Sequence, residues 1–199
     1  ETAVKTKSPH VMLSGAGAEE FAKEQGLEMV EDNMYFATPK TMEWIEKLKQ
    51  ESKKNGTVGC VVLDKQGNLT AGTSTGGMFK KRWGRIGDSP VIGAGTYADN
   101  NSCAVSCTGH GEYFIRHAVA FDVCARYKYL KESVEKAADY IIHTELNTNA
   151  GNGGLIAVDK LGNIAMPYNS GGMFRGFLYK EKGSPEIKKG CGCLLYTSD

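Results

Sequence analysis

The sequence predicts an α+β fold, in which helices and strands are segregated along the chain. Two stretches with a helical repeat of apolar residues come first, before residue 57. From residue 57 the apolar residues follow the two-residue period of strands, and a pair of helical stretches between residues 112 and 142 precedes further strands. This order differs from the regular βαβ alternation of a dinucleotide-binding fold. It favours an arrangement in layers of helices and sheets.

Two helices are expected in the first quarter of the chain. Apolar residues at helical spacing mark the first, over residues 17–25, and Gly26 is placed to end it. The second is expected over residues 38–48, with Thr38 as its N-cap. The polar residues 50–56 that follow are expected to form a solvated linker.

Two hairpins are predicted by one kind of turn. Strand-like residues flank an Asp-Lys-x-Gly-Asn sequence in residues 58–74 and again in residues 154–169. Each hairpin runs into the sequence Gly-Gly-Met-Phe, at 76–79 and at 171–174. The echo is compatible with an internal repeat, although two hairpins with one favourable turn explain most of it.

Strands and helices are both expected between the hairpins. Residues 91–97 and 103–107 are interpreted as short strands. Residues 112–129 are predicted to form one helix, because an apolar residue recurs there at every fourth position. A further helix is expected over residues 133–142, with Ser133 as its N-cap.

Composition narrows the classes of partner. The chain has 199 residues, enough for one domain with a proper core. Its 24 basic and 23 acidic residues give a net charge of +1 without long blocks of one sign, so no nucleic-acid partner is expected. No apolar run approaches the roughly 20 residues of a membrane-spanning helix, and no signal sequence is recognisable. We therefore expect a soluble, cytoplasmic protein without a membrane partner.

The six cysteines are expected to be reduced. Four of them stand in apolar strand-like or helix-like surroundings, where a thiol acts as a small buried hydrophobe: Cys60, Cys103, Cys107 and Cys124. Cys103 and Cys107 would lie on one face of a strand, and this spacing does not suit the short loops of zinc sites. No metal site is predicted.

The pair Gly56-Thr57 permits two interpretations. Gly56 can belong to a turn ahead of a strand, which is the commoner arrangement and is favoured by the pair alone. Alternatively, the bond between Gly56 and Thr57 is cleaved, and Thr57 becomes a chain start whose α-amine can accept the proton of its own hydroxyl. Free α-amines titrate near pH 7.7 to 8.0, so this base is partly neutral at physiological pH.

Five segments, one of which contains the pair itself, decide between the two interpretations. They occur in order and resemble the plant-type L-asparaginase and isoaspartyl aminopeptidase family of N-terminal nucleophile hydrolases, over about residues 9–174. The segments that carry the resemblance are residues 55–64, 72–78, 84–90, 92–99 and 107–112. The resemblance implies a layered αββα N-terminal nucleophile hydrolase sandwich, here incomplete at its N-terminus.

The resemblance also implies a division of the chain by autocleavage. Residues 1–56 would be the C-terminal part of an α subunit, with its helices and linker, and residues 57–189 a β subunit that starts at the nucleophile. Residues 190–199 stay unassigned, as a tail that need not be native sequence. Because the family's earlier strand and sodium-holding loop do not occur in these 199 residues, we expect them to fold poorly on their own.

Each site residue is assigned by its match to a family motif. Thr57 would be the nucleophile and Thr75 its assistant in maturation and turnover. Thr108 and Gly109 would form the oxyanion hole, through a hydroxyl and a backbone N–H. His110 is interpreted as part of the loop structure, because the amine of Thr57 already supplies a base.

Three other residues would bind the substrate. The resemblance assigns the α-carboxylate to Arg85, whose planar guanidinium can bind two oxygens. It assigns the α-ammonium group to Asp88, with help from the backbone of Gly111, and Gly109 would also contact the substrate. Without the resemblance, Arg85 and Asp88 would be interpreted as a surface ion pair.

The implied activity is hydrolysis of amides on the β-carboxyl group of aspartate. Small-molecule substrates, L-asparagine and β-aspartyl dipeptides, would release L-aspartate through an acyl-enzyme, and the cleaved subunits would form a dimer of αβ heterodimers. No cofactor is required, and ligands for a structural sodium or an activating potassium cannot be assigned. Two alternatives stay open, a hydrolase similar to glycosylasparaginases and an uncleaved, inactive relative with a binding or structural role.

Overall fold

A computed structural model describes residues 7, 13–36, 38–39, 42–43, 56–78, 81, 83–180 and 186–192. The chain divides into two compact units, Glu1–Lys53 and Lys54–Asp199. The division falls shortly before the bond between Gly56 and Thr57. Within the described residues, no helix is long and apolar enough to cross a membrane.

The first unit contains the helix α2 (Gly15–Glu24) and the 3-10 helix η1 (Asn33–Phe36). The helix expected at residues 17–25 is thereby confirmed. It ends where Gly26 takes a left-handed conformation, with φ of 65°, which glycine adopts without strain. The second predicted helix lies largely outside the described residues, although Met42 N donates a hydrogen bond to Thr38 O there (2.9 Å).

The described residues of the second unit form three antiparallel sheets. A two-stranded sheet pairs β1 (Thr57–Leu63) with β2 (Leu69–Thr75). A four-stranded sheet has the order β3-β4-β5-β6, and β7 pairs with β8 in a third sheet. The bounds of these last strands are β3 Thr96–Ala98, β4 Cys103–Gly109, β5 Gly153–Asp159, β6 Ile164–Ala165, β7 Arg175–Lys180 and β8 Ile187–Gly192.

Both predicted hairpins are confirmed, and their turns have the same construction. Asp64 Oδ1 accepts hydrogen bonds from the backbone N–H groups of residues 66 and 68, each at 2.8 Å. Asp159 Oδ1 accepts the equivalent bonds from residues 161 and 163, at 2.8 and 2.9 Å. Gly67 and Gly162 have φ of 86° and 91°. The shared turn therefore accounts for the similarity of the two segments.

The helix expected over residues 133–142 is confirmed, because α6 (Val134–Tyr140) continues into the π-helix η3 (Ile141–Leu146). Ser133 caps it by accepting a hydrogen bond from Lys136 N (3.2 Å). Its apolar stripe of Val134, Ala137, Ala138, Ile141 and Ile142 is fully buried.

The prediction of one helix over residues 112–129 is wrong. The structure has α4 (Gly111–Arg116), α5 (Val119–Ala125) and the π-helix η2 (Arg126–Leu130), with a break at Ala118, whose φ is 46°. At the start of α5, Ala120 N donates to Ala94 O and Phe121 N donates to Gly93 O, at 3.0 and 2.8 Å. These tertiary bonds satisfy N–H groups that a continuous helix would use internally.

The strand predicted over residues 91–97 is also shorter than expected. Strand β3 covers only Thr96–Ala98. The residues before it form a turn, in which Gly93 has φ of 89°. The carbonyl groups of this turn are those that accept bonds from α5. The same contact thus shortens the strand and starts the helix.

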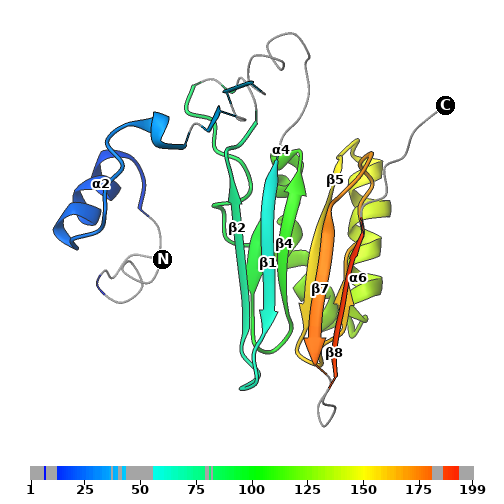
Figure 1. The fold of residues 1–199 in the computed structure, drawn as a ribbon. Coiled ribbons are helices and arrows are strands. Elements are labelled where there is room, and N and C mark those ends of the chain that lie inside the picture. The colour runs from blue at the N-terminus through cyan, green and yellow to red at the C-terminus, as the bar shows by residue number, and fades with distance from the viewer. Residues whose placement is uncertain are drawn as a thin grey trace. The chain divides into compact units, whose positions relative to one another are not determined.

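Strand β4 lies between the β1–β2 hairpin and the helices (Figure 1), and an apolar cluster packs on each of its faces. On one face Val105 and its neighbours pack against α4, α5, α6 and η3, in the main core. On the other face Ala104 packs against the β1–β2 hairpin, next to Leu69 and Val158. The second unit therefore has the hairpin, the four-stranded sheet and a helical layer stacked in this order, and the predicted α+β class is confirmed at this level.

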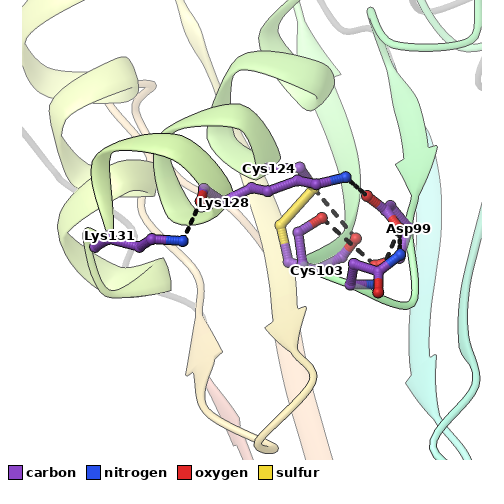
Figure 2. A network of polar contacts seen from close by, with 7 residues as sticks. Asp99, Cys103, Cys124, Lys128 and Lys131 are labelled. Atoms are coloured by element: carbon purple, nitrogen blue, oxygen red, sulfur yellow. Dashed lines mark hydrogen bonds and ion pairs between the residues drawn. A yellow bond between two sulfur atoms is a disulfide. The ribbon is translucent and has the colours of Figure 1, made fainter.

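The expectation of reduced cysteines is wrong for one pair. Cys103 on β4 and Cys124 on α5 form a disulfide, with Cα atoms 5.5 Å apart (Figure 2). The two residues are 21 positions apart, and only the packing of the helix on the strand brings them together. Cys107 is a free, buried thiol as expected, whereas Cys60 is free but exposed.

We predict that the disulfide stabilises the helical layer. Replacing both Cys103 and Cys124 by alanine should lower the free energy of unfolding by about 3 kcal/mol, the entropy contribution of closing a loop of this length. Denaturant unfolding of the oxidised full-length protein measures this free energy. Cys60→Ala is the control, and it should unfold at the same denaturant concentration as the wild type. An equal loss in wild type under reducing conditions is expected, and an unchanged midpoint in the double variant would contradict the prediction.

Candidate active site

Thr57 and Thr75 face each other where the β1–β2 hairpin opens. They are paired residues in the register of the two strands. The Thr57 hydroxyl donates to Thr75 Oγ1 (3.3 Å), and the Thr75 hydroxyl donates to the carbonyl oxygen of Gly56 (2.9 Å). Gly77 N in turn donates to Thr75 Oγ1 (3.0 Å). The peptide bond between Gly56 and Thr57 therefore has a hydroxyl next to it and a hydrogen-bond donor on its carbonyl oxygen.

Arg85 is held by Glu112. Its Nε donates to Glu112 Oε1 (2.8 Å) and its Nη2 donates to Oε2 (2.9 Å), which is a bidentate pair. Hydrogen bonding to Arg85 lowers the pKa of Glu112, and the same bond raises the pKa of Arg85. The Nη1 edge of the guanidinium takes no part in this pair and lies beside Gly87.

Asp88 is a buried acid, with 6% of its surface exposed. Among the described residues its Oδ2 has no hydrogen-bond partner, and burial raises the pKa of its carboxyl group. Its backbone carbonyl accepts bonds from Val91 N and Gly95 N, at 2.9 and 3.1 Å, which hold the residue in a turn. The fold thus keeps one carboxylate oxygen out of water without a hydrogen bond, an arrangement that costs stability.

Two glycines make room for Asp88. A Cβ atom on Gly95 would lie 2.7 Å from Asp88 Oδ2, and one on Gly111 would lie 2.7 Å from Oδ1. The Gly111 position would also bring that atom to 2.9 Å from Arg85 Nη2. A side chain at either position would therefore displace the acid or the guanidinium.

The end of β4 supplies the segment Thr108 to Gly111. Gly109 has φ of 151°, and a Cβ atom there would lie 2.7 Å from the Cα of Gly153 on the neighbouring strand, so this position requires glycine. His110 N donates to the carbonyl of Asn152 (2.9 Å), which anchors the loop through its backbone.

A small cavity brings five of the predicted site residues together. Thr57, Thr75, Arg85, Asp88 and Gly109 all line it, together with Met78 and small neighbours. Of the other predicted residues within the described part of the chain, Thr108 and Gly111 lie beside this cavity and do not line it, and Gly56 precedes Thr57. Two threonine hydroxyls, a guanidinium and a carboxyl group thus share one pocket.

Comparison with known proteins decides the family. The model of the asparaginase family matches residues 2–187, nearly the whole chain. The chain belongs to the asparaginase family. The match reaches further at both ends than the segments that first indicated it. The predicted resemblance is confirmed.

Three curated proteins illustrate the similarity of the chain to known sequences. The chain is 46% identical to an isoaspartyl peptidase of Salmonella typhimurium, over 88% of this chain and 60% of that protein. It is 42% identical to the isoaspartyl peptidase of Escherichia coli, over 90% and 63%. It is 42% identical to a probable isoaspartyl peptidase/L-asparaginase 2 of Arabidopsis thaliana, over 87% and 62%. The chain thus spans about three fifths of the length of these relatives.

Within this asparaginase-family site, Glu112 is the residue that sequence reasoning did not assign. It stands directly after Gly111, in one of the segments that carry the resemblance. What the pattern could not show is the direction of its side chain toward Arg85, 27 positions away. In the described part of the chain, no cluster of His, Cys, Asp and Glu is suited to a metal ion.

We predict that Asp88→Asn stabilises the folded protein. Burial raises the pKa of Asp88 above its unfolded value, so ionised Asp88 destabilises the native state at neutral pH, and this effect disappears as the pH falls below the unfolded pKa, near 4. The melting temperature at pH 7.5 should rise by about 2–4 °C, which corresponds to roughly 1 kcal/mol in a domain of this size.

Asp64→Asn is the matched control for this melt. Hydrogen bonds from Asn68 lower the pKa of Asp64, so its replacement should leave the melting temperature unchanged or lower it. A lower melting temperature of Asp88→Asn than of the wild type at pH 7.5 would contradict the assignment of a destabilising buried charge. A rise in melting temperature at pH 3.5 equal to the rise at pH 7.5 would contradict it as well.

Proposed function

We propose that the full-length protein carrying this chain is an amidohydrolase that activates itself by cleaving the bond between Gly56 and Thr57. It hydrolyses L-asparagine to L-aspartate and ammonia, and it removes β-aspartyl residues from dipeptides. The observation that carries this proposal is the bond from the Thr75 hydroxyl to the carbonyl oxygen of Gly56, with the Thr57 hydroxyl alongside. The names of the relatives, isoaspartyl peptidase and L-asparaginase, support the choice of substrate.

Maturation begins when Thr57 Oγ1 attacks the carbonyl carbon of Gly56. Thr75 donates to the carbonyl oxygen and stabilises the negative charge that develops there. The bond from the Gly56 carbon to the Thr57 nitrogen breaks as the hydroxyl proton passes to that nitrogen, which leaves an ester between the two residues. Water then hydrolyses the ester, which releases the carboxylate of Gly56 and restores the Thr57 hydroxyl beside the α-amine that the broken C–N bond has set free.

Turnover uses the amine that maturation has released. It accepts the proton of the Thr57 hydroxyl as the oxygen attacks the β-amide carbon of the substrate. The Thr108 hydroxyl and the Gly109 N–H stabilise the oxyanion. Ammonia or an amino acid leaves with the proton, and water hydrolyses the acyl-enzyme to L-aspartate.

The substrate is an α-amino acid unit, which carries both charges. Asp88 Oδ2, buried and without a hydrogen-bond partner among the described residues, suits the α-ammonium group. Arg85 keeps its Nη1 edge free of Glu112 and suits the α-carboxylate. Gly111 brings backbone close to both side chains.

The wider architecture is part of the same proposal. It includes the αββα sandwich, the α part in residues 1–56, the β part in residues 57–189 and a dimer of αβ heterodimers, and membership of the asparaginase family supports these assignments. The two contacting sheets with helices on one side support the sandwich. A cytoplasmic location, and an auxiliary sodium or potassium ion, stay predictions. A disulfide between Cys103 and Cys124 persists more readily in an oxidising compartment.

We predict autocleavage of the full-length protein. Its intact mass spectrum should show two fragments that separate between Gly56 and Thr57, and Thr57→Ala should stay as one chain. Thr75→Val should slow cleavage at least tenfold, because the donor to the Gly56 carbonyl is lost. Ser74→Ala, on the exposed face of the same strand, is the control. A single uncut mass in the wild type after days would favour the inactive relative.

We also predict that Arg85→Lys weakens substrate binding. Lysine cannot reproduce the bidentate bond to Glu112, so its ammonium is not held at the guanidinium position. The KM for a β-aspartyl dipeptide should rise at least tenfold with kcat within about threefold, because the binding of the α-carboxylate is shared by ground state and transition state. Arg116→Lys, at the end of α4, should match the wild type, and an unchanged KM for Arg85→Lys would remove this role.

A further inference from the structure

Three hydroxyl groups from three strands meet between the hairpin and the four-stranded sheet. Thr73 Oγ1 lies 2.6 Å from Ser106 Oγ and 2.5 Å from Thr96 Oγ1. Ser106 is 3% exposed, and the other two residues are half-buried. We call Thr73, Thr96 and Ser106 the hydroxyl cluster.

The hydroxyl cluster lies one side-chain layer away from the candidate active site. Because residues two apart in a strand share a face, Thr73 lies on the same face of β2 as Thr75. In the same way, Ser106 shares its face of β4 with Thr108. Two of the strands that carry proposed catalytic hydroxyls are thus joined by a hydrogen bond at the preceding position on that face.

The third member connects the cluster to the substrate-binding turn. Thr96 Oγ1 lies 3.1 Å from the carbonyl oxygen of Ser89, which follows Asp88. Thr73 Oγ1 also lies 3.4 Å from the carbonyl of Gly95, whose N–H bonds to the backbone of Asp88. The cluster therefore joins the strands of Thr75 and Thr108 to the turn of Asp88.

Strand β1 contributes a glycine that leaves space for the hydroxyl cluster. Gly59 pairs with Thr73 in the register and stands two residues after Thr57. A Cβ atom on Gly59 would lie 2.9 Å from the Cβ of Ser106 and would overlap its hydroxyl. Glycine at this position lets Ser106 reach Thr73 at the position next to Thr57 on the same face of the hairpin.

Apolar side chains in place of the three hydroxyls would have been enough to stabilise the contact between the two sheets. One layer further along the same strands, Ala71 and Ala104 belong to an apolar cluster between the sheets. Apolar contacts leave neighbouring strands some freedom to slide, whereas a hydrogen bond sets distance and direction. The change from apolar groups to hydroxyls occurs in the layer that adjoins the candidate active site.

We propose that the hydroxyl cluster is a positioning device, which fixes the strand of Thr75, the strand of Thr108 and the turn of Asp88 relative to one another. This inference rests on the proposed function. Thr73, Thr96 and Ser106 do not touch the substrate, and they act through the residues that do. Their loss should therefore impair the chemical steps more than substrate affinity.

The test compares Ser106→Ala, Thr73→Val and Thr73→Ser in the full-length protein. Autocleavage is followed by intact mass, kcat and KM are measured with a β-aspartyl dipeptide, and a melt confirms that each variant is folded at the assay temperature. Thr70→Val, on the exposed face of β2, is the matched control. Thr96→Val serves as a second variant if Ser106→Ala does not fold.

Ser106→Ala and Thr73→Val should lower kcat about 10- to 100-fold, the effect expected of a displacement on the order of 1 Å, with KM within threefold. Thr73→Ser keeps the hydroxyl and should recover most of kcat. Equal kcat values for Thr73→Ser and Thr73→Val would overturn this inference and leave the proposed function standing. The same holds if kcat is within twofold of the wild type for all variants. A wild type that neither cleaves nor hydrolyses would overturn the proposed function and the inference with it.

Discussion

The structure of the second unit depends on strand β4 being buried on both faces. Toward the helices it presents Cys103, Val105 and Cys107, and toward the hairpin it presents Ala104 and Ser106. Because the side chains of a strand alternate, a slip of one residue would exchange these two sets and place the polar Ser106 in the helical core. The small residues on the hairpin side also allow the two sheets to approach closely. The register of β4 is thereby fixed, and with it the position of its last residues at the candidate site.

The helix that follows β4 is held to the same strand end. Phe114 of α4 is fully buried, and Cβ atoms on Gly109 or Gly153 would lie 2.7 Å from its ring. The ring therefore packs directly on two facing glycines of neighbouring strands. This contact places the start of α4, and so Gly111 and Glu112, beside Arg85 and Asp88. One aromatic residue thus links the end of β4 to Arg85 and Asp88, the pair proposed to bind the substrate.

Sequence reasoning succeeded where the structure is local. The turns at Asp64 and Asp159 form within five residues, and the helix after Ser133 carries both its cap and its apolar stripe. It failed where a distant segment decides, as at the break before α5 and at the disulfide of Cys103. For the site, family motifs supplied the residues, and the packing supplied Glu112. No pattern along the chain reveals that an acid stands opposite Arg85.

The charges at the site bear on the kind of substrate that the proposed function requires. Arg85 is paired with Glu112, so it compensates Asp88 only in part, and burial raises the pKa of that acid. The buried Oδ2 of Asp88 therefore lacks both a paired counter-ion and a hydrogen bond among the described residues. Evolution rarely retains such an oxygen for stability, because a neutral group of the same shape would cost less. A bound ammonium group would supply the missing charge and donors, while a carboxylate on the same molecule would meet the free edge of Arg85. The unpaired acid thus favours a zwitterionic α-amino acid over a neutral amide or a simple anion.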